Sequence, residues 1–265
     1  MLTLYHHGSS VCAAKVRLAL AEKGVEWTGR YIDLLAGEQF APEFLALNPR
    51  GAVPVLVHDG AVLVESTVIC EYVDEAFSGP SLRPADPIGR ARMRLWTKRV
   101  DEEVHPAVRP LTYVTTHRHA ILARGPRAVE EHIASDPHPV WRTRKRRWIE
   151  QGFDAPDVAE ALGVFARLLR DMDEALAQDE WLAGEAWSLA DGALTPYVNR
   201  LDMLGLALLW RDKPHLGRWF EAVRRRASFA PALEQYLPLE LRERMHADGQ
   251  RAAPELARLL GQLPA

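Results

Sequence analysis

A strand, a helix and a second strand follow one another within the first 32 residues, and this order restricts the fold more than any other feature. Residues 2–5 (LTLY) are the first strand candidate, an Ala/Leu-rich helix ends at Lys23-Gly24, and residues 25–32 are the second strand candidate. Gly24 fits a helix C-cap. A helical crossover of this kind joins parallel strands, so the segment predicts a βαβ unit.

The following residues extend this unit into a small α/β domain. A short helical stretch covers residues 40–47, and AVPVLVHDGAVLVES contains two strand candidates joined by Asp59-Gly60, a strong hairpin signal. Ser66 is an N-cap candidate for a helix whose apolar residues recur at helical spacing. We therefore predict the order β-α-β-α-β-β-α for residues 1–79.

The remainder of the chain has a different amino-acid composition. GPSLRPADP is rich in proline and predicts a linker over residues 80–88, followed by an all-helical domain over residues 89–237. Residues 238–265 form a tail or one more amphipathic helix, with its apolar side made by Leu256, Leu259, Leu260 and Leu263. The prediction is an α/β domain followed by a helical one.

Charge and cysteine content narrow the classes of partner. The 265 residues carry a net charge of −3, so no overall basic field points to nucleic acid or to an anionic membrane. Cys12 and Cys70 are the two cysteines, which give neither a disulfide framework nor paired metal-ligand spacing. No apolar run approaches the roughly 20 residues that span a bilayer. We expect an untargeted cytoplasmic protein without a metal.

Three polar groups, Ser9, Ser10 and Cys12, lie where the first helix begins. A hydroxyl there can cap the helix, act as a nucleophile, or donate a hydrogen bond to a bound anion; no activating base for a nucleophile is identifiable. A hydrogen bond to a charged group contributes about 1.5 to 3 kcal/mol, enough to lower a bound thiol's pKa by roughly one to two units. Cys12 is the alternative to a serine as the reactive group, because a thiol at a helix start can itself become a reactive thiolate.

Two further positions could bind a ligand. Pro54 begins a strand candidate, and spacing alone favours a trans bond because only about 5 to 6% of X-Pro bonds are cis. Glu65-Ser66 lies where a strand ends and a helix begins, and the first amides of a helix form a natural carboxylate site. Capping by Ser66 and anion binding are both compatible with this position.

Other conspicuous residues have structural explanations. The basic run at 142–147 is flanked by Trp141 and Trp148, seven apart on one helix face, which predicts tryptophans packed inward and solvated charges. Ser188-Leu189-Ala190-Asp191 has the form of a capping box. His6 and His7 are interpreted as loop or core histidines, since adjacent residues in an extended chain point in opposite directions.

These segments together resemble the cytosolic glutathione transferases. The resemblance covers about residues 2–237 and is carried by LYHHGSSVCAAKVRLALAEKG, LNPRGAVPVLVHDGAVLVESTVICEYVDEAF and SLAD. GSSVCAAKVR is similar to the serine-type classes; NPRG, HDG, ESTVICEY, SLRPADP and RLWTK are most similar to the bacterial branch that contains the glutathione-dependent β-aryl etherases. The resemblance implies a thioredoxin-like glutathione-binding domain and a helical domain that supplies an apolar electrophile site.

The resemblance also implies which hydroxyl activates glutathione. The family's activating serine lies five positions before the basic residue of the KVR or RVR triplet, and counting back from Lys15 gives Ser10. Ser9 takes this role if the loop is shifted by one residue, and Cys12 is another secondary candidate. In etherases of the branch the corresponding serine falls nearer Ala13.

For glutathione binding, the resemblance implies a set of matching positions. Val53 matches the residue whose backbone pairs with the cysteinyl part of glutathione, and Pro54 matches the family's cis-proline, which reverses the trans expectation. Glu65 and Ser66 match the pair that holds the γ-glutamyl amine and carboxylate. Gln39 aligns with a side chain that reaches the glycyl carboxylate.

The electrophile site is expected in the helical domain. Residues 115–157 form a longer segment than in compact transferases of the family, and the helix around Val108 to Thr116 is expected to contribute to specificity. The pocket candidates are His7, Val108, Thr112 and Thr116.

Two positions depart from the family pattern. Ala52 stands where many members carry Gln or Lys beside the tripeptide, so weaker glutathione binding is expected. Gly192 follows SLAD where an apolar staple residue is usual, so a looser helix start is expected.

The resemblance implies a cytoplasmic, homodimeric glutathione transferase that attacks an apolar electrophile, with aryl ethers as one substrate class and detoxification as one role. Glutathione is a cosubstrate, and no metal is required. The alternatives are a glutathione-dependent isomerase, a disulfide reductase that uses Cys12, and a non-catalytic binding protein with the same fold, which Ala52 favours slightly.

Overall fold

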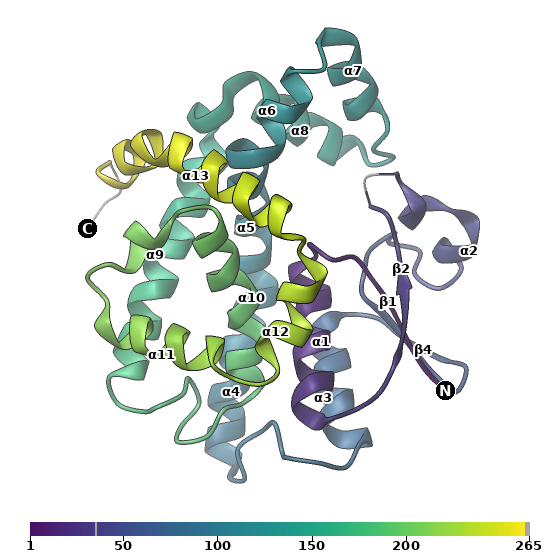
Figure 1. Ribbon diagram of the computed structural model, residues 1–265, viewed down its shortest axis with the longest axis vertical. Coiled ribbons are helices and arrows are strands. Elements are labelled where there is room, and N and C mark those ends of the chain that lie inside the picture. Colours follow the sequence, from purple (N-terminus) through teal and green to yellow (C-terminus); the bar gives the residue numbers. More distant parts are fainter. Residues whose placement is uncertain (35, 263–265) are drawn as a thin grey trace. The chain divides into compact units, whose positions relative to one another are not determined.

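The computed structural model describes residues 1–34 and 36–262 (Figure 1). Two compact units are present. The first contains residues 1–100, 174–198 and 215–238, and the second contains residues 101–173, 199–214 and the chain from Leu239 onward.

A four-stranded sheet lies in the first unit, in the order β2-β1-β3-β4. Strands β1 and β2 are parallel, whereas β3 is antiparallel to both β1 and β4. The elements of this part are β1 (Leu2–His6), α1 (Val11–Lys23), β2 (Thr28–Tyr31), η1 (Glu38–Phe40), α2 (Pro42–Leu45), β3 (Val55–His58), β4 (Ala61–Leu63) and α3 (Ser66–Ala76). The predicted βαβαββα order is confirmed, and helices α1 and α3 pack together.

Local signals in the sequence account for the ends of these elements. Helix α1 ends at Gly24, which has a left-handed φ of 67° and donates its N–H to the carbonyls of Leu20 and Ala21. Asp59 and Gly60 have φ values of 48° and 87°, the two positive values that a type I′ hairpin turn requires. Both the C-cap and the hairpin are therefore confirmed.

Every other regular segment is helical, apart from an isolated bridge between Trp181 and Gly184. The segments are α4 (Pro87–Arg99), η2 (Val100–Val104), α5 (His105–Thr112), η3 (Tyr113–His117), α6 (Arg118–Leu122), α7 (Pro126–Ala134), α8 (Pro139–Gln151), η4 (Gly152–Asp154), α9 (Pro156–Leu176), α10 (Leu189–Met203), η5 (Ala207–Trp210), α11 (Pro214–Arg224), α12 (Phe229–Ala232), η6 (Glu234–Tyr236) and α13 (Leu239–Leu260). The predicted helical character of this region is confirmed.

Helix α13 corresponds to the predicted amphipathic tail. Leu256 and Leu259 are buried in it, and Leu260 is half-buried. Leu263 lies outside the described residues.

The basic run lies on α8, and the environment of its side chains agrees only in part with the prediction. Trp148 is fully buried and donates its indole N–H to Asp157, and Trp141 is half-buried with its ring centroid 6.3 Å from that of Trp148. The charges are not simply solvated, because Arg146 forms a bidentate pair with Glu130 at 2.7 and 2.8 Å. This correction comes from acidic residues on neighbouring segments, which the pattern within α8 does not reveal.

The predicted capping box at the start of α10 is confirmed and extended. The Ser188 N–H donates to Asp191 Oδ2 at 2.9 Å, and the Ser188 hydroxyl accepts the Ala190 N–H at 3.2 Å. Asp191 also accepts the Leu182 N–H at 3.1 Å and the indole N–H of Trp219 at 2.9 Å. This carboxylate therefore joins three segments of the first unit.

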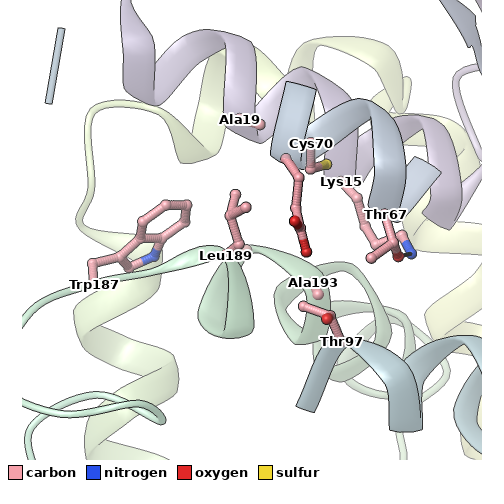
Figure 2. Close-up of a pocket in the computed structure, with 10 residues that line it drawn as sticks. Lys15, Ala19, Thr67, Cys70, Thr97, Trp187, Leu189 and Ala193 are labelled. Carbon is pink, nitrogen blue, oxygen red and sulfur yellow. Dashed lines mark hydrogen bonds between the residues drawn. The ribbon is translucent and has the colours of Figure 1, made fainter. Parts of the chain in front are cut away.

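The structure supplies the reason for a glycine at position 192. A Cβ there would lie 2.9 Å from Cη2 and 3.1 Å from Cζ2 of Trp187, too close for unstrained packing. The Trp187 ring is buried and lines a small pocket with Lys15 and Cys70, as Figure 2 shows. Gly192 therefore makes room for an aromatic ring.

We expect Gly192→Ala to lower the free energy of unfolding by about 1 to 3 kcal/mol, the usual cost of overpacking. In a Trp187→Phe background the two clashing atoms are absent, so the same change should be neutral or stabilise the helix by up to about 1 kcal/mol. Urea unfolding of the four proteins measures this. An equal loss in both backgrounds would show that the ring contact is not the cause.

Candidate functional site

Three loops of the first unit leave the sheet at the same edge. Strand register pairs Tyr5 with Val55 and Leu56 with Leu63. Continuing both registers beyond the strands places His7 opposite residue 53 and residue 54 opposite residue 65. The segments at 7–10, 53–54 and 65–66 therefore converge, which brings most of the predicted glutathione residues to one edge.

In the first loop, Ser9 is hydrogen-bonded to His7. The Ser9 backbone N–H donates to Nδ1 of His7 at 3.2 Å, so this nitrogen is an acceptor, and the Ser9 hydroxyl lies 3.0 Å from the same atom. The hydroxyl proton of Ser9 is consequently directed to the imidazole. His6 and His7 are both buried, as predicted for core histidines.

Ser10 is the N-cap of α1. Its extended backbone, with φ of −74° and ψ of 116°, lets Oγ accept the Ala13 N–H at 3.2 Å. The hydroxyl is an acceptor in this contact, and its own proton has no acceptor within residues 1–34 and 36–262. Ser10 therefore caps the helix and still has a proton to donate, which Ser9 does not.

Cys12 lies in the first turn of α1 and is half-exposed. Its Sγ is 3.8 Å from the hydroxyl of Tyr197, a residue of α10 that is fully buried. A lone cysteine in an Ala-rich helix is usually a buried packing residue, whereas Cys12 is only partly buried.

The second loop contains a cis peptide bond between Val53 and Pro54, as the resemblance implied. Asn48 supports this loop, since its Nδ2 donates to the Ala52 carbonyl at 2.7 Å. Ala52 itself is exposed. Pro54 is buried and Val53 is half-buried.

Gln39 lies beside the second loop. Gly51, with φ of 58°, packs so closely that a Cβ there would be 3.1 Å from the Gln39 carbonyl oxygen and 2.8 Å from the Phe40 ring. The Gln39 amide nitrogen donates to the Leu34 carbonyl at 3.4 Å, and its buried Oε1 has no partner in the described part of the chain. A glycine is required here both for its backbone angle and for lack of space.

The third loop corrects the expected cap. Helix α3 begins at Ser66, so the cap position is Glu65 rather than Ser66, and no side chain caps the helix. The first backbone N–H groups of α3 therefore lack a side-chain acceptor, and Ser66 is buried among them. Glu65 has φ of 66° and ψ of 107°, unusual for a non-glycine residue, and its carboxylate pairs with Arg50.

In the second unit, Val108, Thr112 and Thr116 share one side of a helical segment. Oγ1 of Thr112 donates to the Val108 carbonyl at 2.9 Å, and Oγ1 of Thr116 donates to the Thr112 carbonyl at 2.7 Å. All three are buried, and Thr116 lies in the π-helical turn η3, a kind of turn that is frequent at functional sites. His7 belongs to the other unit.

Neither a metal-binding cluster nor a membrane-spanning helix is found among the residues that the structure describes. Within residues 1–34 and 36–262, no group of three or more His, Cys, Asp or Glu side chains could hold a metal ion. In the same part of the chain, no helix combines the length and apolar composition needed to cross a membrane.

Known families match both parts of the sequence. The family described as "Glutathione S-transferase, N-terminal domain" matches residues 9–76, and "Glutathione S-transferase, C-terminal domain" matches residues 129–227. Protein LigF of Sphingobium sp. (strain NBRC 103272 / SYK-6) is 34% identical over 245 residues, which cover 84% of this chain and 95% of LigF. The chain belongs to the glutathione S-transferase family.

The chain is also similar to a second enzyme of known sequence and to a solved structure. The tetrachloro-p-hydroquinone reductive dehalogenase of Sphingobium chlorophenolicum is 29% identical, with 87% of this chain and 95% of that protein covered. The crystal structure of β-etherase LigF from Sphingobium sp. strain SYK-6 has a TM-score of 0.78 at 33% identity, covering 88% of this transferase and 99% of LigF. The protein is therefore a glutathione transferase enzyme, similar to LigF in sequence and fold.

Sequence reasoning missed several residues that shape this site. Lys15 donates to Thr67 Oγ1 at 3.0 Å and so ties α1 to α3. Arg17 is buried and donates to the carbonyls of His7 and Gly8 at 3.3 and 3.2 Å, which fixes the loop before Ser9. Lys15 and Arg17 belong to the KVR triplet, but nothing in the triplet itself shows that its cations point to backbone and hydroxyl oxygens.

Proposed function

We propose that this transferase cleaves aryl ethers with glutathione as the nucleophile, and that Ser10 stabilises the glutathione thiolate. The observation that carries the role of Ser10 is its uncommitted hydroxyl proton at the N-terminus of α1. The Ala13 N–H bound to Oγ polarises this hydroxyl and strengthens its donation. The substrate class is supported by the similarity to β-etherase LigF.

The reaction follows from these assignments. The thiolate attacks the carbon that carries the aryloxy group, a C–S bond forms and the C–O bond breaks. The electron pair leaves with the aryl oxygen, which takes a proton and departs as a phenol, while glutathione remains as a thioether. No metal and no redox partner enters this balance.

The loops around Ser10 would hold the tripeptide. We propose that the backbone of Val53, next to Pro54, pairs with the cysteinyl part of glutathione. Glu65 binds the γ-glutamyl ammonium, and the uncapped N–H groups at Ser66 bind its carboxylate, an arrangement favoured by the helix dipole. Gln39 is proposed to approach the glycyl carboxylate.

Glu65→Gln is expected to raise KM for glutathione by about tenfold to a hundredfold, because a hydrogen bond to a charged group contributes about 1.5 to 3 kcal/mol. The value of kcat should change far less, since the ammonium is remote from the reacting sulfur. Glu71→Gln is the matched control, as Glu71 lies on α3, the helix that Glu65 precedes, and also pairs with an arginine, Arg94. Steady-state kinetics with varied glutathione tests this; equal KM values for the wild type and Glu65→Gln would contradict the role.

The second substrate would be held in part by the helical segment of the second unit. We propose that Val108, Thr112 and Thr116 line the second unit's part of the electrophile site. Both threonine hydroxyl protons are used within the helix, so these side chains would present mainly methyl groups to a substrate.

The experiment that tests this function incubates the protein with glutathione and 2-phenoxyacetophenone, an aryl ether with an electrophilic carbon. We expect equal amounts of phenol and of the glutathione thioether, measured by liquid chromatography and mass spectrometry. Glutathione disulfide in place of the thioether would indicate reduction, and absence of glutathione binding by calorimetry at millimolar concentration would indicate a binding protein instead.

Half-exposed Cys12 supports a second candidate, thiol-dependent reduction, and the reductive dehalogenase among the relatives is consistent with it. The variant Cys12→Ala distinguishes ether cleavage by glutathione from reduction by the Cys12 thiol. Full retention of ether cleavage in this variant would leave Cys12 without a catalytic role.

We further propose a cytoplasmic homodimer. Its support is the family membership and the low cysteine content of two in 265 residues. Light scattering after size-exclusion chromatography measures the oligomeric state.

A further inference from the structure

We infer that Arg50 is a further glutathione-binding residue, whose guanidinium binds the α-carboxylate of the γ-glutamyl group beside the ammonium site at Glu65. The inference rests on the proposed glutathione site, to which it adds a cation. Arg50 lies in the second loop of the site, and its Nη1 forms an ion pair with Oε1 of Glu65 in the third loop. The second and third loops therefore meet through opposite charges.

Both side chains of this ion pair are accessible and only partly engaged. The exposed fraction is 75% for the Arg50 side chain and 55% for the Glu65 side chain. In the part of the chain that the structure describes, the remaining guanidinium N–H groups of Arg50 and the Oε2 atom of Glu65 have no other partner. A fork of donors and an acceptor oxygen are thus available side by side to one ligand.

The backbone around Arg50 is held in place. Asn48 is 5% exposed; its Oδ1 accepts the Arg50 N–H at 3.1 Å, and its Nδ2 donates to the Ala52 carbonyl at 2.7 Å. Gly51 has a φ of 58° and packs against the Phe40 ring. Because the loop is fixed on both sides of Arg50, mainly side-chain freedom is lost when the guanidinium binds a ligand, which lowers the entropic cost of binding.

The charges of the ion pair match those of the ligand. The γ-glutamyl end of glutathione carries an ammonium and a carboxylate on the same carbon atom. Oε2 of Glu65 can accept from the ammonium, and the Arg50 N–H groups can donate to one carboxylate oxygen, while the uncapped N–H groups at Ser66 donate to the other. Glutathione also has a net negative charge, so a cation at the site favours its approach.

Position 52 gives a reason for this cation. Ala52 stands where many members of the family carry Gln or Lys beside the tripeptide, and it is exposed, with neither a charge nor a side-chain donor. Arg50 lies in the same loop and supplies the donor that alanine lacks. The weaker glutathione binding expected from Ala52 is therefore offset by Arg50.

A competing role for Arg50 has the opposite sign. Arg50 also neutralises Glu65, and if that were its only effect, removal of the guanidinium would strengthen the attraction between Glu65 and the ligand ammonium. The direction of the change in Kd in an Arg50 variant therefore distinguishes the two roles.

Calorimetry with the wild type and Arg50→Ala tests the inference with two ligands. The first is S-methylglutathione, and the second is its analogue with 4-aminobutanoate in place of the γ-glutamyl group, which keeps the ammonium but lacks the α-carboxylate. We expect Arg50→Ala to raise the Kd of S-methylglutathione by about fivefold, a modest effect because both side chains are exposed, and that of the analogue by less than about twofold. Since the methyl group blocks the thiol, the result does not depend on Ser10 or on ether cleavage.

Arg94→Ala is the matched control, because Arg94 pairs with Glu71 of α3 and its removal should leave both Kd values unchanged. Unchanged or tighter binding of S-methylglutathione in Arg50→Ala would overturn the inference. Equal weakening of the two ligands would also overturn it, because Arg50 would then act only by orienting Glu65. Absence of S-methylglutathione binding to the wild type at millimolar concentration would refute the proposed glutathione site itself, and the inference with it.

Discussion

Ser10→Ala is expected to raise the pKa of the bound glutathione thiol by about one to two units, which returns it to the range of a free thiol near 8.5. The variant loses the hydroxyl whose proton has no other acceptor in the described part of the chain. At pH 7 the thiolate fraction, and with it the rate constant for attack, should fall by about tenfold. Ultraviolet titration of the bound thiol and the pH dependence of kcat/KM measure the two effects.

Matched variants separate catalysis from capping. Ser10→Ala also removes an N-cap, at a cost of about 1 kcal/mol, whereas Ser10→Thr retains both the hydroxyl and the cap. Ser9→Ala should leave the thiol pKa unchanged, because the Ser9 hydroxyl is held by His7. The role of Ser10 would be refuted by an identical thiol pKa in the wild type and Ser10→Ala.

Asp191→Ala is expected to lower the free energy of unfolding by about 3 to 5 kcal/mol. Asp191 is fully buried, and its removal leaves the buried N–H groups of Leu182, Ser188 and Trp219 without their acceptor. Asp212→Ala is the control; this exposed carboxylate pairs with Lys213, and its loss should change stability by about 0.5 kcal/mol or less. Urea unfolding monitored by fluorescence provides the measurement.

The loss of unfolding free energy in Asp191→Ala should also depend on pH. Burial raises the pKa of Asp191 from 3.8 to about 6, and its N–H donors oppose the rise. Between these two values the folded state holds the proton more strongly, so the contribution of Asp191 to stability declines as the pH rises. The loss in Asp191→Ala should therefore be about 1 kcal/mol greater at pH 5 than at pH 7. Equal losses at both pH values would contradict the raised pKa.

Much of the first unit was predictable because its signals are local. Gly24 at a helix end and Asp59-Gly60 in a hairpin require backbone angles that few residues adopt, and the structure has those angles. The cap of α3 was predicted one residue late, since Ser66 is a good capping residue but the strained backbone at Glu65 begins the helix earlier.

The resemblance names the residues of the proposed site one by one, but it does not give their geometry. The resemblance selected Ser10 by counting from Lys15, yet Ser9 remained an alternative. The hydrogen bonds distinguish the two, because His7 accepts from Ser9 and the Ala13 N–H leaves the Ser10 proton available.

The sequence by itself determined the order of elements, their caps and turns, and the family, since each depends on residues close together in the chain or on motifs at fixed spacing. Only the tertiary structure decided that Asp191 binds Trp219, that Gly192 accommodates Trp187, and that the rings of His6, Trp27 and Tyr236 pack against one another. The physical reason is that packing and buried hydrogen bonds join side chains from distant segments, and no local pattern records which of them meet.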